Sequence, residues 1–585
     1  MRGSLTAVAA SIAWLAGAAS AQMPAEPHSM PQLPATVADW ARGARLFDGL
    51  GAFHRAITTS SPQAQQYFDQ GMRYLWAFNH DEATRSFAKA AQLDPRCAAC
   101  YWGVALTVGP NYNLAEMKAV RARVAAEALR QAQQNAPHAS AVEQGLIAAL
   151  ATRYPGAEPL DPAALDPVQR AYAAAMRELA QRFPDDLDLQ TLCAEAEMNV
   201  HAWKLWSADG TPTEGTPDIQ ARLEGVLRRD PQHPGANHYY IHTMEASQHP
   251  DKALAAAGRL PGMMPAAGHL EHMPAHILQR VGNYEQAAEA SRRGIAADRD
   301  YLAGTSAPDY YAMYLVHNYS FLAFSAAMEG RKAETLAAVQ SVATAAPLEM
   351  VLAMGDSGWN LSQRYTALVR FGLWDEAIAL GAPDGRAPGL TAGYLFSRGV
   401  ALAARGRLEE ARAALTQMQQ LRAQVPPETA AGFNTLRGIL AVAEPILAAR
   451  IAATEQRNDE ALAQLRAAVA AEDRLAYNEP ADWFFPVRHL LGAQLLIAER
   501  PAEAERVYRE DLQRNPGNGW ALYGLGAALR SQGKAAEAAR VGGQLADAWR
   551  HADIRLQASA FWFAGADNLS CECQRVALNP PAAGS

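Results

Sequence analysis

The sequence has little charge and no excess of basic residues. Charged residues make up 19% of the 585 residues, and 60 acidic residues outnumber 52 basic ones, for a formal net charge of −8. Proteins that bind nucleic acid present a basic surface, so the composition argues against a nucleic-acid partner. Half of the residues are hydrophobic, which excludes a wholly disordered chain. The length indicates several domains or an extended repeat array.

Common catalytic motifs are also absent. The sequence contains no P-loop, no dinucleotide fingerprint, no Gly-x-Ser-x-Gly elbow and no His-Glu-x-x-His motif. Cysteine is scarce, and Cys97 and Cys100 cannot attach haem, because Tyr101 stands where that motif needs His. A local disulfide or a redox pair remains for these two, and the odd number of cysteines implies at least one free thiol. The five cysteines are Cys97, Cys100, Cys193, Cys571 and Cys573.

No long hydrophobic run follows the N-terminus, so we expect no membrane span. The N-terminus itself has the pattern of an export signal, with Arg2, a short apolar stretch from Leu5 to Ala16, and small residues at Ala19 and Ala21. The alternative is a disordered, alanine-rich N-terminus. We predict a signal peptide over 1–21, an extension over 22–62, and a mature protein that is periplasmic or secreted.

The sequence does contain an internal repeat. In a unit that begins at Ala64, small, aromatic and proline residues recur at the positions typical of the 34-residue tetratricopeptide repeat (TPR), a helix–turn–helix. In this pattern small residues let two helices approach, aromatic residues fill the gap between units, and Pro ends the second helix. The residues that carry the pattern are Tyr67, Gly71, Tyr74, Ala83, Phe87, Ala90 and Pro95.

The same frame recurs along most of the chain, and Gly372 and Gly406 are one repeat length apart. Insertions or degenerate units interrupt the frame around 207–217, 302–315 and 470–484, and the stretch 154–167 resembles a linker. The chain therefore resembles the TPR family from about residue 63 to about residue 550. This resemblance implies an all-α, right-handed α-solenoid of TPR-like repeats. We expect one array over 63–350, a second over 351–570 and a tail over 571–585.

The chain also resembles a group of exported bacterial TPR proteins with a histidine-rich central motif. That resemblance implies no activity. The segments that carry it are Cys97-Ala-Ala-Cys100-Tyr-Trp-Gly, Gly109-Pro-Asn-Tyr-Asn113, Asn237-His-Tyr-Tyr-Ile-His242 and His272-Met-Pro-Ala-His276.

Histidines gather in two neighbouring repeats. His238 and His242 precede His272 and His276 by one repeat length each. A spacing of four residues predicts that each pair lies on one face of one helix. Packed helices are about 8–10 Å apart, so the two helices could direct their imidazoles to a common point in the concave groove. Further residues in the same stripe are His269, His317 and Glu245.

This constellation predicts a metal site in the groove. Neutral imidazole is the commonest metal ligand in proteins, and an all-nitrogen set suits Cu, Fe or Zn better than Ca or Mg. Glu245 is a candidate ligand or a general base for bound water. Such a site would make the protein an oxidoreductase with Cu or Fe, or a hydrolase with Zn. The predicted ligands, enough for one or two ions, are His238, His242, His269, His272, His276 and His317, and Glu195 and His489 are outlying candidates.

Two alternatives stay open. The groove could bind a partner protein or peptide, with the histidines as polar contacts, because repeat arrays commonly bind proteins. The histidines could also form a structural network, and repeat duplication could explain the two matched pairs. We expect residues 109–113 to form a turn. Aromatic residues that could border the site or pack between helices are Tyr239, Tyr240, Tyr310, Tyr311, Tyr314, Trp76, Trp102, Trp203 and Trp206.

Overall fold

The computed structural model describes residues 33–114, 117–305, 311–353 and 355–561. The chain divides into two units, 1–32 and 33–585, and all described residues belong to the second. The predicted signal peptide, the tail over 571–585 and Tyr310 therefore lie outside the described residues. Within the described ranges, no helix is both long and apolar enough to cross a membrane.

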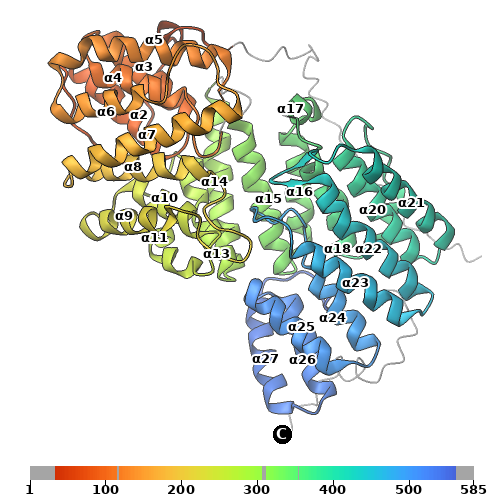
Figure 1. Cartoon of the computed structure of the whole chain (residues 1–585). Coiled ribbons are helices and arrows are strands. Elements are labelled where there is room, and N and C mark those ends of the chain that lie inside the picture. Colours follow the sequence, from red (N-terminus) through yellow and green to blue (C-terminus); the bar gives the residue numbers. More distant parts are fainter. Residues whose placement is uncertain (1–32, 115–116, 306–310, 354, 562–585) are drawn as a thin grey trace, which may run out of the picture. The chain divides into compact units, whose positions relative to one another are not determined.

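Helices make up almost all regular structure in the described part of the chain (Figure 1). The first helices are α1 (Val37–Ala41), α2 (Pro62–Trp76), α3 (His80–Leu93), α4 (Ala98–Thr107), α5 (Ala119–Asn135), α6 (Ala141–Ala151), α7 (Pro162–Arg182), α8 (Leu187–Met198) and α9 (Thr216–Arg229). They are followed by α10 (Pro234–Met244), α11 (Leu254–Arg259), α12 (Gly268–His272), α13 (Pro274–Arg280), α14 (Tyr284–Ala303), α15 (Ala312–Met328), α16 (Lys332–Ala345), α17 (Leu348–Ala353) and α18 (Gln363–Arg370).

The remaining helices are α19 (Trp374–Ala379), α20 (Pro388–Ala404), α21 (Leu408–Gln424), α22 (Leu436–Thr454), α23 (Asn458–Glu472), α24 (Val487–Ile497), α25 (Pro501–Arg514), α26 (Gly519–Ser531) and α27 (Ala535–Ala548). Short 3₁₀ segments lie at Ala136–His138, Asn199–His201, Pro250–Ala253 and Trp359–Ser362. The only strands among the described residues are β1 (Ala430–Ala431) and β2 (Asn434–Thr435), which pair antiparallel.

Helices that follow one another in the chain pack together, as α2 with α3, α14 with α15, α15 with α16, and α22 with α23 (Figure 1). Each such pair buries an apolar face that a single helix would expose to water. The predicted all-α fold of TPR-like helical repeats is confirmed. The predicted boundary between two arrays at 350/351 stays a prediction.

The repeat pattern has the expected steric cause. Phe87 lies between Gly71 of α2 and Gly103 of α4, and a Cβ atom added at either glycine would come within 2.5 Å of the Phe87 ring. The glycines therefore let three helices close around one aromatic ring. At the turns between paired helices, Gly372 and Gly406 have φ values of 67° and 73°, a left-handed conformation that glycine adopts at little cost.

Two local predictions need correction. His269 and His272 lie on α12 and His276 lies on α13, because the helical hydrogen bonding is interrupted after Met273, whose backbone angles stay helical. Pro274 causes the break, since it has no N–H to donate and its ring disfavours a continuous helix. The stretch 154–167, which resembled a linker, is also partly helical, because α7 begins at Pro162.

Candidate metal centre

Three of the predicted histidines form a first cluster, site A, consisting of His238, His242 and His269. Helix α10 carries the first two, and α12 carries the third. All three side chains are buried, and one nitrogen from each lies within 4.8 Å of the other two. The Nε2 atoms of His238 and His269 are 3.1 Å apart. Site A therefore gathers imidazoles from two consecutive repeats.

Hydrogen bonds orient two of these rings. Nδ1 of His238 donates to the carbonyl oxygen of Trp76 at 2.6 Å, and Nδ1 of His242 is hydrogen-bonded to Oε1 of Glu245 at 3.0 Å. A neutral imidazole that donates from Nδ1 has a bare lone pair on Nε2, which is the arrangement found in metal-ligating histidines. Nε2 of His242 is buried and has no hydrogen-bond partner.

A second cluster, site B, consists of His272, His276 and His317, from α12, α13 and α15. Nε2 of His276 lies 3.0 Å from Nε2 of His272 and 3.2 Å from Nε2 of His317. One ring nitrogen has either one proton or one lone pair in the ring plane, so it cannot satisfy both neighbours by hydrogen bonding. A metal ion between the three rings explains these short distances, because ligand nitrogens about 2 Å from a tetrahedral ion are roughly 3.3 Å apart.

The two sites are equivalent in the repeat frame. Each combines a pair of histidines four residues apart with the histidine at the second position of the next unit, namely His269 in site A and His317 in site B. Because of the insertion over 302–315, His269 and His317 are more than one repeat length apart in the sequence. The two clusters therefore place all six histidines at matching positions of the repeat.

Aromatic rings cover both sites. The ring of Phe78 lies 4.5 Å from that of His238 and 5.6 Å from that of His242. Phe321 covers site B, with its ring 4.6 Å from those of His272 and His276. Burial lowers the pKa of His242 to about 3 and holds the pKa values of His238, His269, His272 and His276 well below the usual range. These rings are therefore neutral at neutral pH, the form that binds metal.

Two carboxyl groups lie between the sites. Oε2 of Glu245 is 2.9 Å from Nδ1 of His276, and a Glu479 oxygen contacts the same nitrogen. Burial raises the pKa values of both carboxyl groups well above the ordinary range, and their mutual repulsion raises that of Glu479 further. Glu245, the predicted ligand or base, thus lies beside the Nδ1 atoms of His242 and His276, and with His276 and Glu479 it forms a third group whose ligand atoms lie within 4.8 Å of one another.

Glu479 was not predicted from the sequence. It lies in the segment between α23 and α24, within the irregular stretch 470–484 of the repeat pattern. No spacing relates it to the histidines, since it is 203 residues from His276. The interruption of the repeat pattern at 470–484 was the one feature of the sequence that indicated a special role for this segment.

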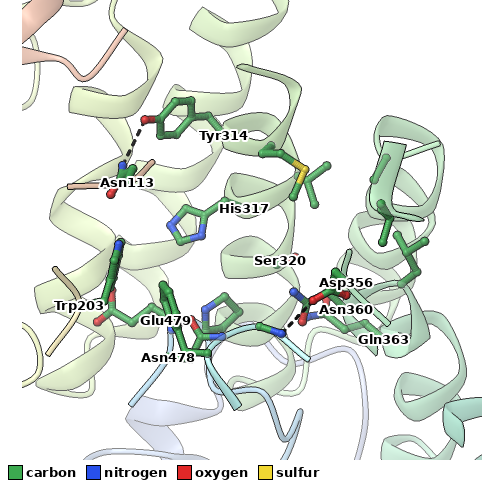
Figure 2. A pocket seen from close by; sticks show the side chains of 18 of the residues that line it. Asn113, Trp203, Tyr314, His317, Ser320, Asp356, Asn360, Gln363, Asn478 and Glu479 are labelled. Atoms are coloured by element: carbon green, nitrogen blue, oxygen red, sulfur yellow. Dashed lines mark hydrogen bonds between the residues drawn. The ribbon is translucent and has the colours of Figure 1, made fainter. Parts of the chain in front are cut away.

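A cavity of about 360 Å³ opens beside both sites (Figure 2). His242 and His269 of site A and His276 and His317 of site B line it. The opposite wall consists of residues from the second half of the chain, including Asp356, Phe433 and Glu479. The prediction that the histidines line an open groove needs correction, because five of the six are buried and four of the six line a small cavity.

The outlying candidates have other partners. His489 is buried against Asp511, with an Nε2 to Oδ2 distance of 2.9 Å, and Arg370 contacts its other nitrogen. Glu195 accepts a hydrogen bond of 2.6 Å from Asn199. Neither residue belongs to the His/Glu groups gathered among the described residues.

Several aromatic candidates do border the centre. Tyr314 and Trp203 line the cavity, and Tyr112, at the predicted turn over 109–113, contacts the rings of Trp203 and His242. Tyr311 instead donates a hydrogen bond to Asp298 at 2.8 Å.

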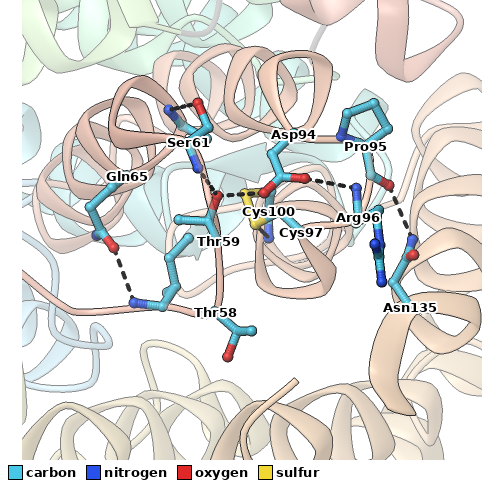
Figure 3. The surroundings of a disulfide bond; sticks show 12 residues. Thr58, Thr59, Ser61, Gln65, Asp94, Pro95, Arg96, Cys97, Cys100 and Asn135 are labelled. Carbon is cyan, nitrogen blue, oxygen red and sulfur yellow. Dashed lines mark hydrogen bonds between the residues drawn. A yellow bond between two sulfur atoms is a disulfide. The ribbon is translucent and has the colours of Figure 1, made fainter. Parts of the chain in front are cut away.

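The cysteines within the described ranges neither line the cavity nor belong to the His/Glu groups. Cys97 and Cys100 form a disulfide at the start of α4, near Asp94, which accepts a hydrogen bond from Thr59 (Figure 3). Cys193 is a buried free thiol. Cys571 and Cys573 lie outside the described residues. Of the two alternatives for the first pair, the structure contains the local disulfide.

The sequence matches no protein-family profile and no curated protein. Human IFIT1, solved as a dimer with m7Gppp-AAAA, is similar at 12% identity, with a TM-score of 0.32, covering 77% of this chain and 90% of that chain. Yeast Tom70 is similar at 12% identity, with a TM-score of 0.27, covering 83% of this chain and 91% of that chain. Likenesses this remote carry no argument about function.

Proposed function

We propose that the chain binds two transition-metal ions, one at site A and one at site B. The observation that carries the proposal is the convergence of three Nε2 atoms in site B at 3.0 and 3.2 Å, which hydrogen bonding alone cannot satisfy. The repeat-equivalent site A supports it, because the His238 ring is held with Nε2 bare and Nε2 of His242 is buried without a hydrogen-bond partner.

The donor set fits Cu, Fe or Zn, because it consists of neutral imidazole nitrogens with carboxylates behind them. Such an ion, when bound, supplies redox chemistry if it is Cu or Fe and Lewis-acid activation of water if it is Zn. The side chains of this protein supply three nitrogens per ion and exclude water on the side covered by Phe78 and Phe321. The cavity leaves the opposite side accessible to a small molecule. We propose a metal-dependent enzyme on this basis.

The proposal includes export. The basic, apolar and small residues over 1–21 support a periplasmic or secreted location. A disulfide between Cys97 and Cys100 fits an oxidising compartment.

The test is elemental analysis of the purified, untagged mature protein by plasma mass spectrometry. We expect two equivalents of Cu, Fe or Zn per chain. Less than half an equivalent of every metal, after incubation with each and desalting, would show that the histidines form a structural network.

A second candidate function is a scaffold that binds a partner protein or peptide, which the TPR-like fold favours. Because five of the histidines are buried, a peptide would contact other residues. Partner binding that survives complete chelation of metal, in a protein without metal-dependent activity, would favour this candidate.

A further inference from the structure

The cavity beside sites A and B has the features of a binding site for a small organic molecule. An apolar cavity of about 150 Å³ accommodates benzene, so the 360 Å³ here can hold a substituted ring. Both sites contribute histidines to its wall, so a molecule in the cavity lies against both.

The charge of the wall disfavours an anionic ligand. Among the described residues that line the cavity, none is Lys or Arg, so a carboxylate or phosphate finds no cationic side chain. Of the two acidic lining residues, Asp356 accepts hydrogen bonds from the backbone N–H groups of Gly358 and Gly432. Glu479 contacts His276, and both of its oxygens are buried without a hydrogen-bond partner.

Aromatic side chains form the mouth of the cavity. Trp203 and Phe433 pack with their ring centroids 4.9 Å apart, and Trp203 also lies edge-on to His242 at 5.6 Å. Trp203 has a φ of 60°, a conformation that costs a non-glycine residue energy and is concentrated at functional sites. Phe433 is 49% exposed although it is large and apolar.

The position of Phe433 is determined by its hairpin. It follows Gly432, whose φ of 64° suits the tight turn between β1 and β2. Asn434 anchors the next strand by donating to Asp482 at 2.7 Å and to the carbonyl of Ala476 at 3.1 Å. The phenyl ring is thus presented to Trp203 by a turn that does not depend on the ring itself.

One acceptor near site A lacks a donor. Tyr314 donates to the carbonyl of Phe78 at 3.2 Å and therefore accepts from the side-chain amide of Asn113 at 3.1 Å (Figure 2). This pairing fixes the amide orientation and leaves Oδ1 of Asn113 buried without a partner. Because Tyr314 packs on His269 with ring centroids 4.7 Å apart, the unpaired oxygen lies at the histidine end of the cavity.

From these features we infer that the cavity binds a neutral phenol. The aromatic ring packs within the apolar walls behind Trp203 and Phe433, where ring–ring contacts favour an aromatic over an aliphatic molecule. The hydroxyl group lies at the histidine end, where it donates to Asn113 and presents its oxygen to sites A and B. This inference deepens the proposed function. The role of the metals rests on that function, whereas the binding of the phenol ring does not rest on it.

The test is calorimetric titration of the full mature protein, stripped of metal by chelation, with para-ethylphenol. We expect saturable binding with one site. Phe433→Ala should weaken it about tenfold, because much of one aromatic contact is lost. The matched control is Leu254→Ala, which removes another exposed large apolar side chain, 41% exposed and remote from the cavity lining, and should change nothing.

Three comparison probes test the chemistry. We expect para-ethylbenzoate to bind about tenfold more weakly, because no cation lines the wall. Ethylbenzene should bind more weakly than the phenol to the wild type but equally to Asn113→Leu, which lacks the acceptor. Ethylcyclohexanol should bind more weakly because it lacks the ring faces.

Equal binding of the benzoate, equal binding of ethylcyclohexanol, or no binding of the phenol with and without metal would overturn the inference. Its failure is separable from that of the proposed function. A protein with two equivalents of metal and no phenol binding retains the metal sites and loses the inference. A protein that binds the phenol but no metal retains the phenol site and loses the metal sites.

Discussion

Oε1 of Glu245 is hydrogen-bonded to Nδ1 of His242 at 3.0 Å. The other oxygen of the same carboxyl group lies 2.9 Å from Nδ1 of His276. Because His242 belongs to site A and His276 to site B, one buried side chain contacts both sites. A group in this position sets ring orientation and ligand basicity without binding the metal itself.

Replacement of Glu245 by Gln tests this role. Glu245→Gln keeps the volume but weakens the acceptor, so we expect metal affinity to fall about 10- to 100-fold, at site A above all, with helical content unchanged. Competition titration with a chelator of known affinity measures the loss. Glu289→Gln, in an exposed position of α14, is the matched control. Unchanged affinity at both sites would contradict the role.

The two sites should empty independently. His238→Ala removes a ligand of site A and His272→Ala one of site B, so we expect each variant to retain one of two metal equivalents and the double variant to retain none. Elemental analysis measures this, with His551→Ala, a partly exposed histidine, as control. Two equivalents of metal in either single variant would show that the replaced histidine is not needed to bind the ion of its site.

Metal should stabilise the repeats that bind it. An ion that binds only the folded chain adds about 4 kcal/mol per site when its free concentration is a thousand times Kd. We therefore expect chelation to speed amide hydrogen exchange in α10, α12, α13 and α15, while α25 to α27 stay unchanged. Uniform acceleration along the whole chain, or none, would contradict local binding at sites A and B.

Asp298 should make stability depend on pH. The side chain is fully buried, and desolvation raises its pKa from 3.8 to about 7. Between these values the folded protein keeps a proton that the unfolded chain releases, so the free energy of unfolding falls as pH rises from about 4 to about 7 and then levels off. The loss amounts to a few kcal/mol at most.

Asp298→Asn should remove this fall, because an amide does not ionise. The change is tolerable in place, since Asn318, which donates to Asp298 at 2.7 Å, has an unpaired Oδ1 and can turn its amide to accept. We expect the variant to gain stability relative to the wild type as pH rises. Denaturant unfolding of metal-free protein at several pH values measures it, and a constant difference would refute the assignment.

Local sequence determined the helices and the ligand pairs. The contact of Phe87 with Gly71 follows from a pattern within one repeat, and the pairing of His238 with His242 follows from the helical period. Even the equivalence of His269 and His317 is visible in the repeat frame, because packing between neighbouring units is itself periodic. Sequence by itself thus specified an all-α repeat fold and which six histidines would gather.

The tertiary structure decided what faces the histidines. The approach of His317 to His272 and His276 depends on where the insertion over 302–315 returns the chain. Glu479 and Phe433 reach the centre from irregular segments between helices, with no period that relates them to the histidines. Contacts of this kind depend on how distant repeats pack, which no local spacing encodes. The sequence determined which histidines gather, because the repeat frame is local, and only the tertiary structure enclosed them beside a cavity.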